Sequence, residues 1–153
     1  MSAVLSPKTQ HRAAAVGGVV LLLPLASCGG NSIDDYCGAV KEHQTQLTNL
    51  FSEQSNAAIF KALPTLRDLR DAAPDDIRAD WNQLVSALTQ LQEALHDAGV
   101  TPEQYHAGKP PAGISAADRA KITAAANAVG DAQTASAQIL QQVRDVCHTQ
   151  LTL

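Results

Sequence analysis

The sequence predicts an all-α protein, an antiparallel four-helix bundle with up-down-up-down topology. Apolar residues recur at intervals of three and four along four segments, roughly residues 32–54, 56–73, 74–98 and 116–150. Most connections between these segments are short, which favours antiparallel neighbours. No segment shows the strict polar and apolar alternation that is typical of strands.

The first predicted helix, residues 32–54, begins at Ser32. Asp35 follows three residues later, so the two side chains can form a capping box. Gln44 interrupts the apolar face, and we expect it to reach a polar partner. The apolar positions of this helix are Ile33, Cys37, Val40, Leu47 and Phe51.

The second predicted helix, residues 56–73, contains a proline. Pro64 either kinks this helix, because it removes one backbone hydrogen bond, or opens a new helix at its first position. The apolar face is formed by Ile59, Leu63, Leu66 and Leu69.

The third predicted helix, residues 74–98, shows the clearest pattern. Pro74 is expected at the first helical position and Gly99 at the C-terminal cap. Its apolar residues alternate steps of four and three, which predicts a seam facing another helix. They are Ile77, Trp81, Leu84, Leu88, Leu91, Leu95 and Ala98.

The fourth predicted helix, residues 116–150, is the longest. Ser115 precedes it, and Asp118 lies three residues on, again as in a capping box. Its first half is rich in alanine, and a bend is expected near Gly130. Its face comprises Ile122, Ala125, Val129, Ala132, Ile139, Val143 and Val146.

The amino-terminal segment is a leader. Lys8 and Arg12, with no acid, precede an apolar run of 13 residues, which is too short for the roughly 20 of a membrane-spanning helix. The run ends in Leu25-Ala26-Ser27-Cys28. Together these features resemble the signal and lipobox of bacterial lipoprotein precursors. The alternative is an ordinary signal peptide, with Cys28 a plain thiol.

The lipoprotein resemblance implies a domain organisation and a location. Residues 1–27 would be a cleaved signal peptide, and residues 28–31 the lipidated Cys28 and a flexible tether. Residues 32–153 would form the bundle domain. Acyl chains such as palmitate on Cys28 would attach the protein to the cell membrane, facing outward, since two chains anchor stably.

The other two cysteines then form an even pair. With Cys28 assigned to lipid, Cys37 and Cys147 remain, and an exported chain lies where disulfides persist. The up-down-up-down topology places both at the end of the bundle near Cys28. We therefore expect one disulfide at this base; the alternative is two free buried thiols.

Charge excludes several classes of partner. Without the leader, 9 basic and 15 acidic residues remain, a formal charge of −6. This balance argues against nucleic acid as a partner and against adhesion to anionic lipid. The acyl anchor must therefore attach the protein to the membrane.

Acids and arginines are expected to lie together at the base of the bundle, where they would interact with the helix ends; the alternative is a cation site. These are Asp34, Asp35, Asp75, Asp76, Asp80, Arg67, Arg70 and Arg144.

Catalytic and metal motifs are weak. Glu93 and His96 match the Glu-x-x-His of metal-binding bundles, but the register of Leu91 and Leu95 points them outward. The remaining histidines lack metal-ligand spacing, and no nucleophile or phosphate-loop motif occurs. We therefore predict that the protein is not an enzyme and has no cofactor or metal site. The alternative is a metal-dependent enzyme, which would need carboxylates that point inward.

The predicted function is a non-catalytic binding or scaffolding role at the cell envelope, with an unidentified envelope protein as partner. The alternative is a carrier of a small apolar ligand, because the alanine-rich stretch could leave a pocket between the helices. Residues 116–129 must overhang the bundle, bend at Gly130 or be covered by residues 99–114. We predict that residues 99–129, including Tyr105, His106 and Lys109, form a contact surface, unless this stretch is only a long connection.

Overall fold

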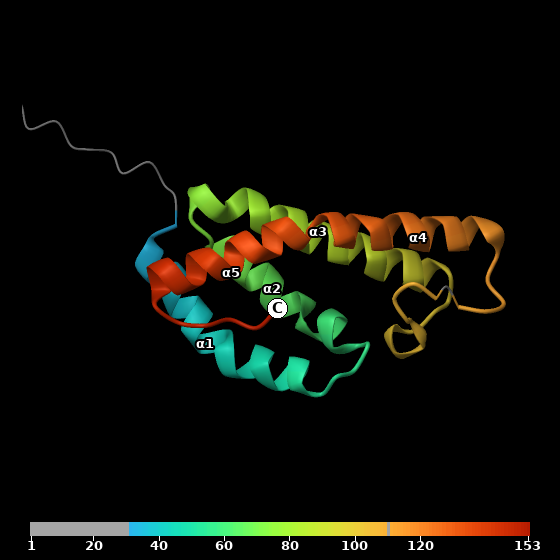
Figure 1. Ribbon diagram of the computed structural model, residues 1–153, viewed down its shortest axis with the longest axis horizontal. Coiled ribbons are helices and arrows are strands. Elements are labelled where there is room, and N and C mark those ends of the chain that lie inside the picture. Colours follow the sequence, from blue (N-terminus) through green and yellow to red (C-terminus); the bar gives the residue numbers. More distant parts are fainter. Residues whose placement is uncertain (1–30, 110) are drawn as a thin grey trace, which may run out of the picture.

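The computed structural model describes residues 31–109 and 111–153, and its regular structure is helical (Figure 1). The prediction of an all-α fold is thus confirmed. The predicted leader and Cys28 lie outside the described residues. The helices are α1 (Ile33–Ser52), α2 (Ala58–Ala72), α3 (Asp75–Asp97), the short 3-10 helix η1 (Pro102–Gln104), α4 (Ala116–Asp131) and α5 (Gln133–Cys147).

Serine caps begin α1 and α4, as the sequence predicts. The Ser32 hydroxyl accepts a hydrogen bond from the Asp35 backbone N–H at 3.1 Å. The Ser115 hydroxyl accepts one from the Asp118 backbone N–H at 3.0 Å. Each cap satisfies a helical N–H that has no partner within its own helix.

Glycine ends α3, also as predicted. Gly99 adopts a φ of 66°, and the Val100 N–H donates to the Leu95 carbonyl at 2.9 Å. This left-handed turn is the Schellman cap that glycine favours. One proline prediction needs correction, because α3 begins at Asp75, one residue after Pro74. Of the two alternatives for Pro64, the structure shows a proline inside α2 and not the start of a new helix.

The fourth predicted helix is two helices. The break lies at Ala132, two residues beyond Gly130, where the backbone adopts φ −79° and ψ 0°. Helix α5 then ends at Cys147, because His148 adopts a left-handed φ of 52°. The predicted helical residues 148–150 are therefore not part of α5.

The main core fills the space among α1, α2, α3 and α5. At its base Tyr36 and Trp81 are inaccessible to solvent, and Trp81 Nε1 donates to the Tyr36 hydroxyl at 3.0 Å. Cys37 and Cys147 lie beside them with Cα atoms 5.1 Å apart, and they form the predicted disulfide. Ile33, predicted on the buried face, is 47% exposed, since it lies in the first turn of α1.

The C-terminal segment closes one side of this core. After His148 the chain runs back along α1, and Leu151 is buried in the core (Figure 1). The Thr149 hydroxyl donates to the Gln44 side-chain oxygen at 3.2 Å. Gln44 thus interrupts the apolar face of α1 because it bonds to a segment that crosses there, which confirms the predicted polar partner.

A second, smaller core forms where α4 packs on α3, at the end of the molecule far from residue 31 (Figure 1). Residues 100–109 and 111–114 fold back over this end, where Val100 is buried in the second core and Tyr105 and Ile114 pack against it. Of the three arrangements expected for residues 116–129, the structure thus shows coverage by the preceding loop. The buried members are Phe60, Leu91, Leu95, Val100, Ile122 and Ala125.

The buried Tyr36 phenol predicts a loss of stability in alkali. Burial raises the Tyr36 pKa to about 12. The Trp81 hydrogen bond lowers the pKa and the Asp76 charge raises it, but both effects are smaller than that of burial. The neutral phenol is favoured in the folded state, so stability is unaffected below the unfolded pKa of about 10 and falls as pH rises toward 12. The expected slope is about −1.4 kcal/mol per pH unit.

Urea unfolding between pH 9 and 12 would measure this slope. Tyr36→Phe should be less stable by about 1–3 kcal/mol at neutral pH, because Trp81 loses its acceptor. It should also have a shallower alkaline slope. Equal slopes in the two proteins would show that Tyr36 is not the responsible group.

Candidate ligand-binding groove

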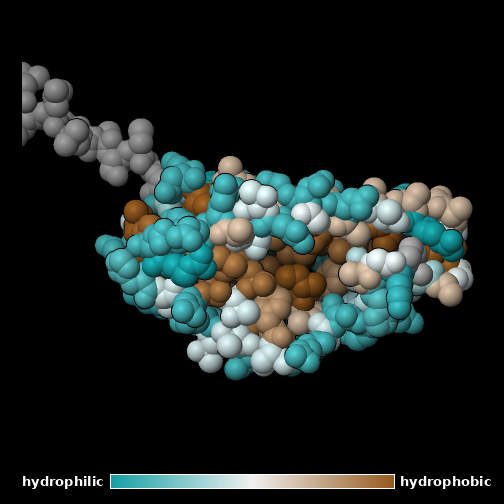
Figure 2. All heavy atoms as spheres, viewed as in Figure 1, coloured by the Kyte–Doolittle hydropathy of each residue, from teal (hydrophilic) through white to brown (hydrophobic). Residues whose placement is uncertain are grey.

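A groove of about 590 Å³ opens where the two cores meet. It is lined by the start of α2, the middle of α3, one face of α4 and residues 105–109. Figure 2 shows apolar atoms gathered in a hollow in the middle of this face, with polar atoms along both sides. Its volume lies within the range of about 300–1,000 Å³ that is usual for small-molecule sites.

The floor of the groove is apolar. Leu88 of the main core and Leu91 and Ile122 of the second core are buried and still contribute to the lining. Ile59 and Val129 also line it, and each packs against both the main and the second core. The floor exists because α4 continues along α3 beyond the point where α2 begins, so these side chains lack a covering helix.

The rim is formed by the loop. The rings of Tyr105 and Phe60 meet edge to face, with centroids 6.2 Å apart and planes at 80°. This contact buries the phenol, and burial raises the Tyr105 pKa. His106 Nδ1 lies 2.9 Å from the side-chain nitrogen of Asn56, two residues before α2, so the loop is tied to the start of that helix.

The three predicted contact residues come together at this groove. Tyr105, His106 and Lys109 all line it, and the Lys109 N–H donates to the His106 carbonyl at 3.0 Å in a tight turn. Tyr105 is half-buried, whereas the side chains of His106 and Lys109 are exposed at the mouth. The sequence predicted these residues on a contact surface, and the structure places them around a hollow.

Sequence reasoning missed the amide groups of the groove. Asn56, Asn127 and Gln133 line it beside the apolar floor. No spacing in the sequence marks them, because they come from three separate segments. Asn127 lies in the alanine-rich stretch and Gln133 follows it. The apolar pattern there is too weak to show which side of the helix is buried.

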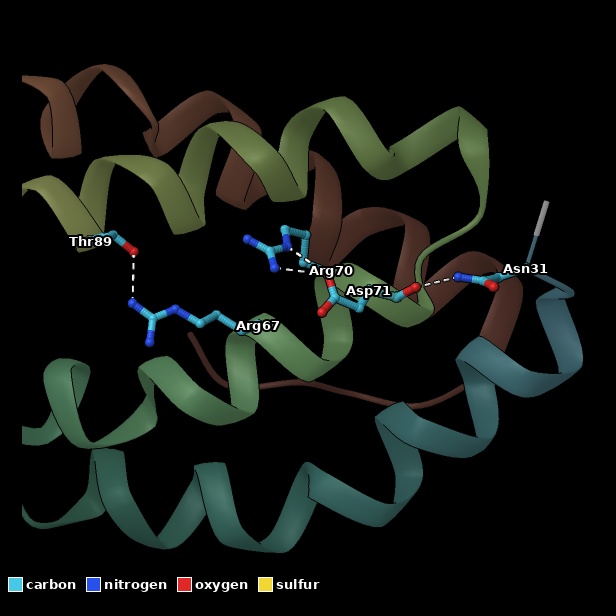
Figure 3. Close-up of polar contacts among 5 residues, drawn as sticks. All are labelled: Asn31, Arg67, Arg70, Asp71 and Thr89. Carbon is cyan, nitrogen blue, oxygen red and sulfur yellow. Dashed lines mark hydrogen bonds and ion pairs between the residues drawn. The ribbon is translucent and has the colours of Figure 1, made fainter. Parts of the chain in front are cut away.

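At the opposite end, polar contacts fasten the start of the described chain. Asn31 donates to the Asp71 backbone carbonyl, and Arg70 pairs with the Asp71 carboxylate at 2.8 Å (Figure 3). Arg67 instead reaches α3 and donates to the Thr89 hydroxyl at 3.1 Å. The last residue of the predicted tether therefore contacts the domain.

The predicted gathering of acids and arginines at the base is only partly seen. Arg78 pairs with Asp75 at 3.2 Å within α3, while Arg144 donates to Gln141 within α5. These are local contacts, as expected for helix-end electrostatics. Within residues 31–109 and 111–153, no cluster of three or more histidine, cysteine or acidic side chains is arranged to hold a metal ion.

The Glu-x-x-His motif faces outward, as its register predicts. Glu93 and His96 are exposed, while Leu91 and Leu95 on the opposite side of α3 are buried in the second core. The neighbour that His96 contacts is Asp97, at 3.8 Å on the same surface.

Comparison with known proteins gives no family for this chain. No protein-family model matches it, and no curated protein or solved structure is significantly similar to it. Its function must therefore be inferred from its own residues. Over the part of the chain that the structure describes, no helix is both long and apolar enough to cross a membrane.

Proposed function

We propose that this protein is a lipid-anchored, outward-facing protein of the cell membrane with a non-catalytic binding role at the envelope. The anchor is proposed from the lipobox-like Leu25-Ala26-Ser27-Cys28 and the leader before it. The binding role is proposed from the groove, which is the observation that carries it. An apolar hollow with a few polar groups at its edge is the usual form of a binding site.

We infer that the helices alternate in direction, with α4 and α5 together forming the fourth. Residues 53–57 and 73–74 are short connections that favour antiparallel neighbours. The Cys37–Cys147 bridge supports this topology, because it joins the start of α1 to the end of α5. In this arrangement the groove is separated from the proposed anchor by the length of α1, roughly 30 Å.

Two kinds of ligand fit a site in this position. A segment of an envelope protein could dock over the loop, which the position farthest from the membrane would leave accessible. A small apolar ligand could instead fill the groove, and the volume of about 590 Å³ favours this second candidate. A non-catalytic role is proposed because the His106 ring contacts an amide rather than a carboxylate that could orient it for proton transfer.

Site-specific photo-cross-linking in intact cells tests this proposal. A benzophenone side chain would be placed at Ala107, which is exposed and lines the groove. The matched control is Gln46, which is exposed on α1 and does not line it. We expect an adduct of defined mass from Ala107 and not from Gln46.

Replacement of residues 103–112 by a glycine-serine link provides the second arm. The variant should keep the helical spectrum, since these residues lie outside the main core, and should lose the binding partner. For this variant the benzophenone side chain would be placed on α4, because Ala107 is removed. If the variant folds and still captures every partner at the parental level, the loop and groove are not the binding site.

A further inference from the structure

We propose that the groove takes a single-chain amphiphile with a carboxylate head, a long-chain fatty acid, with the chain on the apolar floor and the carboxylate at Lys109. This inference rests on the proposed function, because it names the ligand of the same site. It depends on three observations: the charge of the lining, the position of its polar groups, and the open shape of the groove.

The lining is cationic in a chain that is acidic overall. The whole sequence carries 15 acidic and 11 basic residues, yet no aspartate or glutamate lines the groove. Lys109 is the one lysine or arginine among the lining residues. None of the ion pairs between described residues includes Lys109. A carboxylate at the mouth would therefore meet a positive charge with no competing acid in the lining.

A second donor lies in the same turn as Lys109. His106 Nδ1 lies 2.9 Å from the Asn56 amide nitrogen, so Nε2 is the ring nitrogen left for another partner. Lys109 and His106 are held together by the hydrogen bond between the Lys109 N–H and the His106 carbonyl. The turn thus presents an ammonium group and an imidazole nitrogen side by side, and a carboxylate can accept hydrogen bonds from such groups.

The shape separates head from chain. Lys109 and His106 are exposed at the mouth, while Leu88, Leu91 and Ile122 form a buried floor. The groove is open to the surface, as Figure 2 shows, so a charged head can remain hydrated while an acyl chain lies on the floor. This arrangement suits an amphiphile better than a compact polar ligand, whose polar groups would face apolar side chains without partners.

The test compares three probes that share one chain and differ in head charge: oleic acid, oleyl alcohol and oleylamine. Binding to the protein without the leader, residues 28–153 carrying Cys28→Ala so that no acyl chain is present, would be measured by calorimetry at neutral pH. We expect oleic acid to bind about two- to fivefold more tightly than the alcohol, as for an exposed ion pair, and the amine to bind most weakly. Lys109→Gln should abolish this preference, whereas Lys121→Gln, exposed on α4 outside the lining, should keep it.

A blocking variant locates the binding. Gly130 lines the groove within α4, and an added Cβ there would meet no atom within 4 Å. Leucine is also a better helix former than glycine, so Gly130→Leu should fold. It should weaken all three probes by about tenfold or more, because a leucine displaces several methylene groups of the ligand. Gly38→Leu, on open space in α1, is the matched control and should bind normally.

The outcomes separate this inference from the proposed function. Equal binding of the three probes, or a carboxylate preference that survives Lys109→Gln, would overturn the fatty-acid inference and leave the groove as an apolar site. If no probe binds while the Ala107 cross-link persists, the fatty-acid inference is wrong and the binding role stands. If Gly130→Leu leaves every affinity unchanged and the Ala107 cross-link is absent, both fail.

Discussion

Cys28→Ala should release this protein from the membrane fraction of the cell. The lipobox-like sequence provides one thiol for lipid, and the formal charge of −6 without the leader gives the domain no electrostatic attraction to anionic lipid. Loss of the acyl chains therefore removes the membrane attachment that we propose. Cell fractionation followed by immunoblotting would measure the released share, and helical circular dichroism would show that the domain remains folded.

Ser27→Ala is the matched control for this experiment. It keeps a small residue before Cys28, so the variant should be lipidated and retained in the membrane like the parent. Metabolic labelling with an alkyne fatty acid would report the modification directly. Full membrane retention of the Cys28→Ala protein, together with an unlabelled parent, would contradict the anchor.

Cys37→Ser should lower the free energy of unfolding by about 4–5 kcal/mol, the chain-entropy value for a loop of roughly 110 residues. The bridge joins residues 110 positions apart, and both cysteines are buried in the main core. For a domain of this size the melting temperature should fall by about 15 °C. Thermal unfolding of the exported protein, followed by circular dichroism, would measure the shift.

The cysteine variants contain their own control. Cys147→Ser removes the same bond, so both single variants and the double variant should unfold at similar temperatures. Reduction should lower the melting temperature of the parent protein and leave the variants unchanged. Two free thiols in the non-reduced exported protein would refute the bridge.

Features that depend on local chemistry could be predicted from the sequence. The caps at Ser32 and Ser115 and the glycine turn at Gly99 need only neighbouring residues, and the structure contains all three. The disulfide could also be predicted. With Cys28 assigned to lipid, two cysteines remained, and the expected topology placed both at the same end of the bundle. The periodicity of α3 identified its buried face correctly from Ile77 to Leu95.

Features that depend on packing between distant segments could not be predicted. The sequence predicted a bend near Gly130, but not that the helix would end two residues further on, at Ala132, in a run of small residues. The groove requires Tyr105 to pack against Phe60 and α4 to extend along α3 beyond α2. The sequence contains these residues but no spacing that relates them, so Tyr105, His106 and Lys109 could be proposed as a surface without revealing the hollow.

An isoleucine-methyl NMR titration with oleic acid tests the central claim, that the groove is the binding site, most directly. Ile59 and Ile122 line the groove, Ile77 and Ile139 are buried in the main core, and Ile33 is exposed at the base. We predict saturable shifts of the Ile59 and Ile122 methyl signals, with those of Ile33, Ile77 and Ile139 nearly unchanged. Shifts confined to Ile33, or no shift at Ile59 and Ile122 at saturating ligand, would contradict the account.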